Sequence, residues 1–233
     1  QRAPLTSVSS TECVVARMRI NGAPGPNGLP GSVFRVNSRA WSGPLTSLYN
    51  ACFFEMGVPH SWQGSLLCPI FKQGARMDPQ NYRLIALLDL EVKGYAQLLL
   101  RDLEAWVLDN NILPVYQTGF RSQASTVDNV VILVYLVHQA TRPQKTPLHC
   151  CFVDFSAAFD NVDRNILWGK LTKWGIPYPL LAAIRSLYVD TWVRVKLADS
   201  YLTPEIRTSS GLKQGCVLAP LLFNVYLADL GSA

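Results

Sequence analysis

The segment LHCCFVDF at residues 148–155 constrains the fold of this chain more than any other feature. It is an almost uninterrupted apolar run, and a strand of this composition is typically covered on both faces by other parts of the protein. Near its end stands Asp154, a carboxylate whose burial costs free energy unless a partner offsets that cost. The run therefore predicts a buried central strand with one carboxylate at its exit. Asp154 is then either a turn residue or a ligand for a metal ion.

Composition limits the class of protein around that strand. The chain has 233 residues, of which 49% are hydrophobic and 10% aromatic, as is typical of a packed globular protein of one large domain or two small ones. Its net charge of +5 favours an anionic partner without identifying it. The longest apolar run, VVILVYLV at 130–137, is too short to span a bilayer, so we expect no membrane partner.

The cysteines and histidines do not suggest a disulfide framework or a zinc site. The 6 cysteines include no CxxC pair and show no regular spacing, and the 3 histidines are scattered. Such cysteines behave as small hydrophobic residues when they are reduced. We therefore expect an intracellular protein, and the sequence does not distinguish the nucleus from the cytoplasm.

The order of the predicted elements is that of a mixed α+β domain. The first 60 residues contain the breaker-rich stretch NGAPGPNGLPGS, which predicts loop followed by short helices. Residues 65–74 and 81–90 predict an antiparallel hairpin, and residues 192–210 predict a second hairpin that turns at 198–200. Helical spacing or capping signals predict further helices at 39–56, 90–110, 125–138, 163–174 and 179–189, with another in LLFNVYLADL.

Five blocks of this sequence, in order, resemble the reverse transcriptases of non-LTR (long interspersed) retrotransposons. FVDFSAAFD is similar to the first catalytic motif of that family, and WQGSLLCPIFKQGARMDPQNYRLIALL resembles its fingers segment. The other blocks are APGPNGLPG, YQTGFRSQASTVDNV and GLKQGCVLAPLLFNVYLADL, the last of which is similar to the Gln-Gly motif of the family. Together the blocks cover most of the chain.

This resemblance implies a right-hand polymerase fold with fingers and a partial palm, an antiparallel palm sheet packed on helices, and no thumb. Residues 1–61 would form an N-terminal extension that leads into the fingers, and residues 62–233 a C-terminally incomplete fingers and palm domain. The implied activity is RNA-directed DNA polymerisation, in which dNTPs are added to a DNA 3′ end on an RNA template. The implied partners are the RNA template, the DNA primer and dNTPs, while protein partners are not indicated. Two Mg²⁺ ions are expected in the complete enzyme.

The resemblance also assigns roles to individual residues. Asp154 matches the aspartate that bridges two magnesium ions, and the carbonyl of Phe155 is expected to be a further ligand. Lys72 and Arg83 match the fingers residues that clamp the incoming triphosphate, which suits an ammonium and a forked guanidinium. Phe159 falls at the aromatic gate that excludes a ribose 2′-hydroxyl. The alternatives are core packing for Phe159 and an ordinary exposed hairpin for the two cations.

Three further positions, Gln214, Gly215 and Arg121, complete the expected site. Gln214 and Gly215 match the loop that stacks against the new base pair and lets backbone approach the nucleotide. Arg121 is expected to contact nucleic-acid phosphate, with an ordinary surface arginine as the alternative. Asp160 matches an acidic position of the motif and is assigned only a supporting role, and Asp163 is expected to cap the next helix.

One element of the family pattern is missing from these 233 residues. Reverse transcriptases carry a second aspartate pair in a YADD-like hairpin, and this chain contains no Asp-Asp pair. Asp229, in YLAD, aligns instead with the helix after the Gln-Gly motif. We therefore expect the fragment to be inactive alone, and whether the chain itself is an enzyme stays open. The alternatives are a catalytically dead, retrotransposon-derived nucleic-acid-binding relic and a group II intron-type reverse transcriptase.

Overall fold

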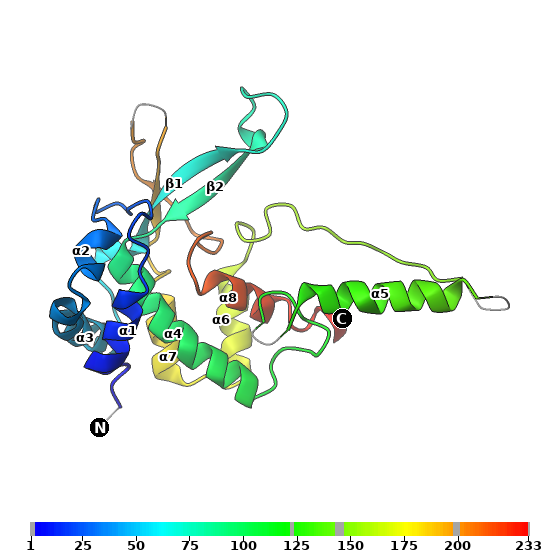
Figure 1. Ribbon diagram of the computed structural model, residues 1–233, viewed down its shortest axis with the longest axis horizontal. Coiled ribbons are helices and arrows are strands. Elements are labelled where there is room, and N and C mark those ends of the chain that lie inside the picture. Colours follow the sequence, from blue (N-terminus) through cyan, green and yellow to red (C-terminus); the bar gives the residue numbers. More distant parts are fainter. Residues whose placement is uncertain (1–2, 122–123, 143–146, 198–200, 233) are drawn as a thin grey trace.

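The computed structural model describes residues 3–121, 124–142, 147–197 and 201–232. Its helices are α1 (Val8–Ala16), α2 (Gly31–Arg35), α3 (Ser38–Glu55), α4 (Leu90–Asp109), α5 (Thr126–Ala140), α6 (Arg164–Lys173), α7 (Tyr178–Ser186) and α8 (Ala219–Tyr226) (Figure 1). Its strands are β1 (Gly64–Phe71), β2 (Tyr82–Leu87), β3 (Trp192–Val195) and β4 (Ile206–Arg207). These elements confirm the mixed α+β class. Among the described helices, none has the length and apolar composition needed to cross a bilayer.

The four strands form one mixed sheet in the order β2-β1-β3-β4. Strands β1 and β2 pair antiparallel from Leu66↔Leu87 to Phe71↔Tyr82, which confirms the first predicted hairpin. Strands β3 and β4 also pair antiparallel, although the predicted turn at 198–200 lies outside the described residues. The expectation of an antiparallel sheet is wrong at its centre, because β1 and β3 run parallel. Helices α4 to α7 lie between these two strands in the chain, and a long crossover of this kind is what parallel pairing requires.

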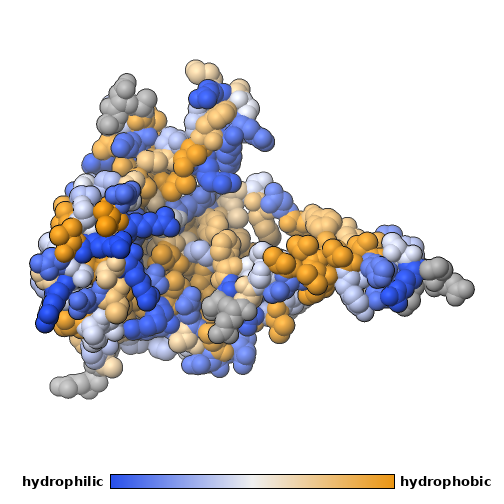
Figure 2. All heavy atoms as spheres, viewed as in Figure 1, coloured by the Kyte–Doolittle hydropathy of each residue, from blue (hydrophilic) through white to orange (hydrophobic). Residues whose placement is uncertain are grey.

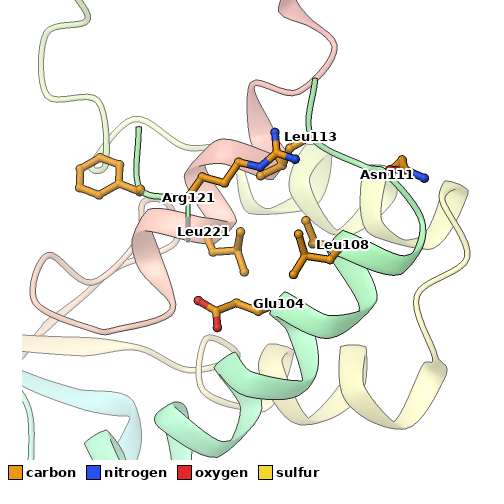
Figure 3. A pocket seen from close by; sticks show the side chains of 8 residues that line it. Glu104, Leu108, Asn111, Leu113, Arg121 and Leu221 are labelled. Atoms are coloured by element: carbon orange, nitrogen blue, oxygen red, sulfur yellow. The ribbon is translucent and has the colours of Figure 1, made fainter. Parts of the chain in front are cut away.

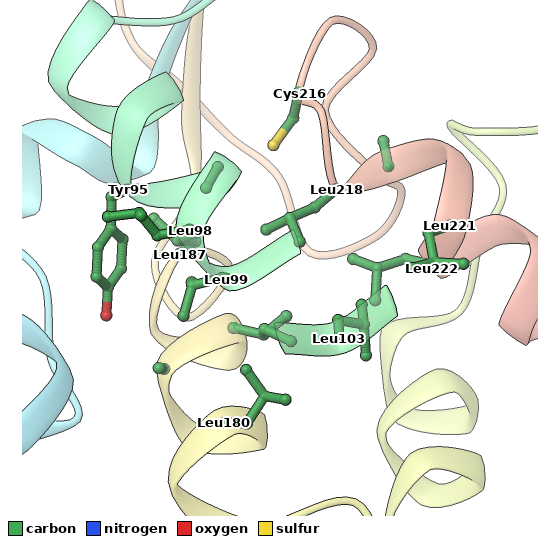
Figure 4. Close-up of a cluster of buried hydrophobic side chains, with 14 of the residues drawn as sticks. Tyr95, Leu98, Leu99, Leu103, Leu180, Leu187, Cys216, Leu218, Leu221 and Leu222 are labelled. Carbon is green, nitrogen blue, oxygen red and sulfur yellow. The ribbon is translucent and has the colours of Figure 1, made fainter. Parts of the chain in front are cut away.

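Helix α4 is the centre of the hydrophobic core. Its buried residues are dense between Leu90 and Leu99 and then follow the helical spacing at Leu103, Trp106 and Val107. Figure 4 shows Tyr95, Leu98, Leu99 and Leu103 of α4 close to Leu180 and Leu187 near α7 and to Leu218, Leu221 and Leu222 near α8. On its other side α4 meets α1 and α3, and the Tyr49 hydroxyl of α3 donates a hydrogen bond to the Glu91 carbonyl at 3.0 Å. The core thus joins the N-terminal helices to the elements that follow β2.

The buried strand predicted at 148–155 is wrong. Residues 147–155 form no strand and are exposed, with Phe152 at 81% and Val153 at 73% of full exposure. An extended segment becomes a strand only where a neighbour pairs with its backbone groups, and no described strand lies beside this one. Asp154 is consequently exposed, and it does not stand at the exit of a buried strand.

Helix α5 precedes this segment and projects away from the rest of the described chain (Figure 1). Its N-cap is Ser125, whose side chain forms a capping box with Asp128. None of its residues is buried, and Figure 2 shows its apolar side chains at the surface. The apolar composition of residues 126–155 therefore has no counterpart in burial within the described part of the chain.

Arg164, the first residue of α6, ties the loop after β4 to the core. Its Nε donates to the Gly211 carbonyl at 2.8 Å, Nη2 donates to the Ser210 carbonyl at 2.9 Å, and Nη1 donates to the Thr191 hydroxyl at 2.8 Å. Burial lowers the pKa of the guanidinium, which these acceptors offset by replacing its lost water. The Asp163 side chain caps the same helix by accepting from the next turn, as predicted.

Lys213 is a second buried cation in this region. Its Nζ donates to the Trp62 carbonyl at 3.2 Å and lies 5.8 Å from the centroid of the Tyr188 ring. Burial lowers the pKa of Lys213 from 10.5 to about 8. The loop between β4 and α8 is therefore anchored by two cations that bond mainly to backbone carbonyls.

We expect Arg164→Met to lower the free energy of unfolding by about 3 kcal/mol, because several buried acceptors would lose a charged donor. Urea denaturation followed by circular dichroism measures this loss. The control is Arg101→Met, whose half-exposed side chain bonds Asp102 and the Leu5 carbonyl, and here we expect a loss below about 1 kcal/mol. Equal losses in the two variants would contradict the anchoring role of Arg164.

We expect Lys213 to make stability depend on pH in the alkaline range. Between about pH 8 and pH 10.5 the folded protein releases the Lys213 proton while the unfolded chain keeps it, so its contribution to stability rises with pH. Below about pH 8 both forms hold the proton and that contribution is constant. The free energy of unfolding, compared with that of Lys213→Met, should therefore be higher at about pH 10 than at about pH 7. An identical difference at both pH values would refute this.

Candidate functional site

Six of the residues predicted from the sequence line one large open cleft of about 1540 Å³. The cleft lies among the β1–β2 hairpin, the segment 154–160, the end of β3 and the loop before α8. The predicted residues on its walls are Lys72, Arg83, Asp154, Phe155, Phe159 and Gln214. Residues more than 140 positions apart in the chain therefore share one surface, as the ligand-binding interpretation requires.

One wall of the cleft carries unpaired positive charge. Lys72 follows β1, with its backbone N–H bonded to the Asn81 carbonyl at 2.8 Å, and Arg83 lies in β2 opposite Ile70. Both are exposed, and neither takes part in an ion pair within the described ranges. Two cations of one hairpin, without acidic partners among the described residues, provide a binding surface for an anion such as a phosphate chain.

Arg76 is a third cation of the cleft, and sequence reasoning missed it. It stands in the turn between β1 and β2, with its guanidinium carbon 4.9 Å from the centroid of the Phe71 ring. The signal was present as a basic residue in QGARMDPQ, but only the closed hairpin brings it to the cleft. With Arg76 the lining contains three cations against two carboxylates, Asp154 and Asp160.

Asp154 and Phe155 also line the cleft, at the end of the exposed segment 147–155. Asp154 can supply carboxylate oxygens to a hard cation such as Mg²⁺. Across the described ranges, however, no three His, Cys, Asp or Glu side chains lie close enough together to hold a metal ion. The described residues thus form no complete metal-binding cluster, and the expectation that Asp154 and the Phe155 carbonyl bind magnesium stays a prediction.

Phe159 both packs against another ring and lines the cleft. It is half-buried, and its ring packs against Phe223 of α8 with centroids 5.0 Å apart. The same residue lines the cleft, and its carbonyl accepts from the Leu212 backbone at 2.8 Å. Because the Phe223 ring packs behind it, a ligand in the cleft cannot easily displace the Phe159 ring.

The loop of Gln214 and Gly215 touches β2 through the backbone. The Ala86 N–H donates to the Gln214 carbonyl at 2.7 Å. Gly215 has φ +114°, and a Cβ at this position would lie 2.5 Å from the Ala86 carbonyl oxygen. Only glycine fits a position with both restrictions. Gly215 is thus not part of the cleft lining, but it lets the loop carry Gln214 onto that wall.

The Gln214 side chain contacts Asp160, and this contact could not be read from the sequence. Its Nε2 donates to Asp160 Oδ2 at 3.2 Å. Partial removal of water raises the pKa of Asp160 above its usual value, and the hydrogen bond from Gln214 opposes this shift. Both residues also line a smaller pocket of about 390 Å³ that includes Arg164, Arg207 and Lys213.

Arg121 lies away from the cleft, beside a small cavity of about 20 Å³ between the end of α4 and α8. Its Nη1 donates to the Pro114 carbonyl at 3.1 Å. Figure 3 shows its side chain close to Leu113, with Glu104 and Leu221 on other walls of the cavity. The structure thus does not bring Arg121 together with the other predicted residues, and its contact with nucleic acid stays a prediction.

Asp229 is also outside the cleft. It is exposed beyond the end of α8 and forms an ion pair with Lys170 of α6. This pair lowers the pKa of the Asp229 carboxyl. Asp229 thus lies just beyond the helix with which it was aligned, and it does not line the cleft with Asp154.

Comparison with known proteins places these residues in a family. The sequence model of the family described as "Reverse transcriptase (RNA-dependent DNA polymerase)" matches residues 70–232. The probable RNA-directed DNA polymerase from transposon BS of Drosophila melanogaster is 33% identical over 187 residues, which cover 80% of this chain and 20% of that protein. Two others from the same organism, the probable RNA-directed DNA polymerase from transposon X-element and the RNA-directed DNA polymerase from mobile element jockey, are 27% and 25% identical, each covering 97% of this chain.

This chain spans about a fifth to a quarter of the length of these relatives, since it covers 20%, 25% and 25% of them. All three relatives are named as RNA-directed DNA polymerases from transposons or mobile elements. Because the family match extends over well more than half of the sequence and includes most of the cleft, this chain belongs to the reverse transcriptase (RNA-dependent DNA polymerase) family.

Proposed function

We propose that this chain carries the nucleotide-binding part of an RNA-directed DNA polymerase of the non-LTR retrotransposon kind. The polymerase adds dNTPs to a DNA 3′ end on an RNA template. The observation that carries this proposal is the single cleft that gathers Lys72, Arg83, Asp154, Phe159 and Gln214. The names of the relatives, which are RNA-directed DNA polymerases of transposons, support a retrotransposon rather than a group II intron as the source.

In this proposal the cationic wall holds the triphosphate of the incoming dNTP. Lys72 offers a compact charge and Arg83 a planar fork that bonds two phosphate oxygens. Their attraction to the phosphates is strong because neither has an acidic partner to release within the described ranges. Arg76 adds charge at the end of the same hairpin.

Phe159 and the Gln214–Gly215 loop select the nucleoside. Phe159 is backed by Phe223, so its ring cannot move aside for a ribose 2′-hydroxyl, and deoxyribose is favoured. The loop is fixed to β2 by the Ala86–Gln214 backbone bond, which places the Gln214 amide on the wall that the base would meet.

In terms of the polymerase right hand, we assign β1 and β2 to the fingers. Segment 154–160 with α6 and α8 belongs to a partial palm. Residues 1–61 then form the N-terminal extension that leads into the fingers. This extension is linked to the hairpin of the cleft through α4, which begins soon after β2 ends. The Tyr49 hydroxyl donates a hydrogen bond to the Glu91 carbonyl in the first turn of α4.

Bound magnesium would stabilise the charge that develops on the transferred phosphate. Asp154 and the Phe155 carbonyl would be among its ligands, and a two-metal site would need further carboxylates. We therefore propose that this chain binds substrates but does not extend a primer alone. The same lack of a ligand cluster in the described ranges favours a second candidate function, a nucleic-acid-binding relic without chemistry.

The cationic wall gives the first test of the proposal. We expect the 233-residue chain to bind dTTP, and we expect Lys72→Ala and Arg83→Ala each to weaken that binding about 10-fold, the usual effect of losing one charged hydrogen bond. Isothermal titration calorimetry measures the affinities. Lys173→Ala, which removes an exposed cation of α6 outside the cleft, is the matched control and should change nothing. No binding by the wild type, or equal binding by all variants, would reject the nucleotide site.

A hybrid of poly(rA) and oligo(dT) tests the contact with template and primer that both candidate functions share. We expect the chain to bind it with a logarithmic affinity that falls linearly with the logarithm of salt concentration, because phosphate contacts release counterions. With dTTP and Mg²⁺ we expect no extension of the primer. Extension that disappears in Asp154→Ala would reject the relic and show that the carboxylates suffice, whereas binding that does not depend on salt would reject the proposed contact with template and primer.

A further inference from the structure

Asp160 lines the cleft, and the family resemblance gives it only an unspecified supporting role. It follows Phe159 directly and accepts a hydrogen bond from Gln214 Nε2 at 3.2 Å. Asp160 and Gln214 both line the large cleft, and both also line the smaller pocket next to it. The bonded pair therefore stands at the division between the two cavities.

The backbones on both sides of this bond are fixed. Gly211, with φ +80°, packs so closely on Asp160 that a Cβ there would lie 2.7 Å from the Asp160 carbonyl oxygen. The Gly211 N–H donates to the Val162 carbonyl at 2.9 Å, and the Gln214 carbonyl accepts from Ala86 at 2.7 Å. The distance between the two residues is thus set by the fold, and only their side chains remain to be oriented.

The chemistry of the pair decides which way the Gln214 amide faces. An ionised carboxylate accepts hydrogen bonds and cannot donate them, so it must bind the amide through its NH₂ group. This orientation leaves Gln214 Oε1 as an acceptor that is not engaged with Asp160. Without Asp160 the amide would be free to turn about its terminal torsion, which has a broad preference.

We propose that Asp160 is a positioning residue that orients the Gln214 side chain for the incoming nucleotide. This inference rests on the proposed function, since it assumes that a dNTP occupies the cleft. A nucleotide that covers the cleft would displace water from the Asp160–Gln214 bond and strengthen it, because a hydrogen bond counts for more in a low dielectric. In the free protein the bond is exposed and contributes little to stability.

A purely structural role would predict a different chemistry at this position. Among the ion pairs of the described residues none includes Asp160, so its charge does not serve an ion pair. Asp163, three residues later, is the contrasting case, because its side chain caps α6 by accepting from Asn165 and Ile166. The two aspartates therefore provide a matched pair, one facing the cleft and one supporting a helix.

The test compares dTTP affinity, measured by calorimetry, in four variants. Asp160→Ala should weaken binding about 3- to 5-fold, because the amide loses its partner. Asp160→Asn should stay within about 2-fold of the wild type, because its Oδ1 still accepts. Gln214→Glu should weaken binding through repulsion between two carboxylates. The double variant Asp160→Asn with Gln214→Glu should recover most of the loss, because the asparagine NH₂ then donates to the glutamate.

The control is Asp163→Ala, which removes the cap of α6 and should lower the melting temperature without changing dTTP affinity. Asp160→Ala should show the opposite pattern. Wild-type affinity in Asp160→Ala, or no recovery in the double variant, would overturn the positioning role while leaving the nucleotide site intact. A wild-type chain that does not bind dTTP would overturn both the nucleotide site and the positioning role. If the wild type binds dTTP and Lys72→Ala weakens that binding, the nucleotide site stands, and only the positioning role has failed.

Discussion

The backbone hydrogen bond from Ala86 to Gln214 is the contact on which the geometry of the cleft depends. It joins β2, the edge strand of the sheet, to the loop that precedes α8, although 128 residues separate them in the sequence. Gly215 makes this approach possible, because any side chain there would collide with the Ala86 carbonyl. Through this one contact the cationic hairpin faces the segment that carries Asp154, Phe159 and Asp160.

Buried residues next to this contact hold the loop in place. Arg164 and Lys213 bond to backbone carbonyls on the buried side of the loop. Helix α4 connects the same loop to the N-terminal helices through a continuous apolar core. Buried cations bonded to carbonyls are costly to desolvate, so they are effective only where the surrounding backbone is already in place. Lys213 and Gln214 are neighbours in the sequence, but the Lys213 side chain is buried whereas Gln214 lines the large cleft.

The arm of α5 and residues 147–155 is built differently from this compact part. Apolar side chains such as Val134 and Phe152 are exposed along it, at 62% and 81% of full exposure. Hydrophobic burial is the main favourable contribution to the free energy of folding. These exposed residues contribute little of it within the described part of the chain. Asp154 lies at the end of this arm. The position of the predicted metal ligand therefore depends on an exposed segment that packs little against the core.

The sequence alone determined the local structure and the chemical class. The antiparallel pairing of β1 with β2, the helix α4 and the cap Asp163 were predicted, because each depends on residues close together in the sequence. The motif residues around Lys72, Asp154 and Gln214 were expected from the resemblance to a known family. Tertiary structure decided what depends on distant parts of the chain. It set the parallel pairing of β1 with β3, the exposure of residues 148–155, the separate place of Arg121, the addition of Arg76 and the bond between Asp160 and Gln214. The spacing of apolar residues in the sequence specifies which side of a helix or strand a residue lies on. It does not identify the distant segment that packs against that side.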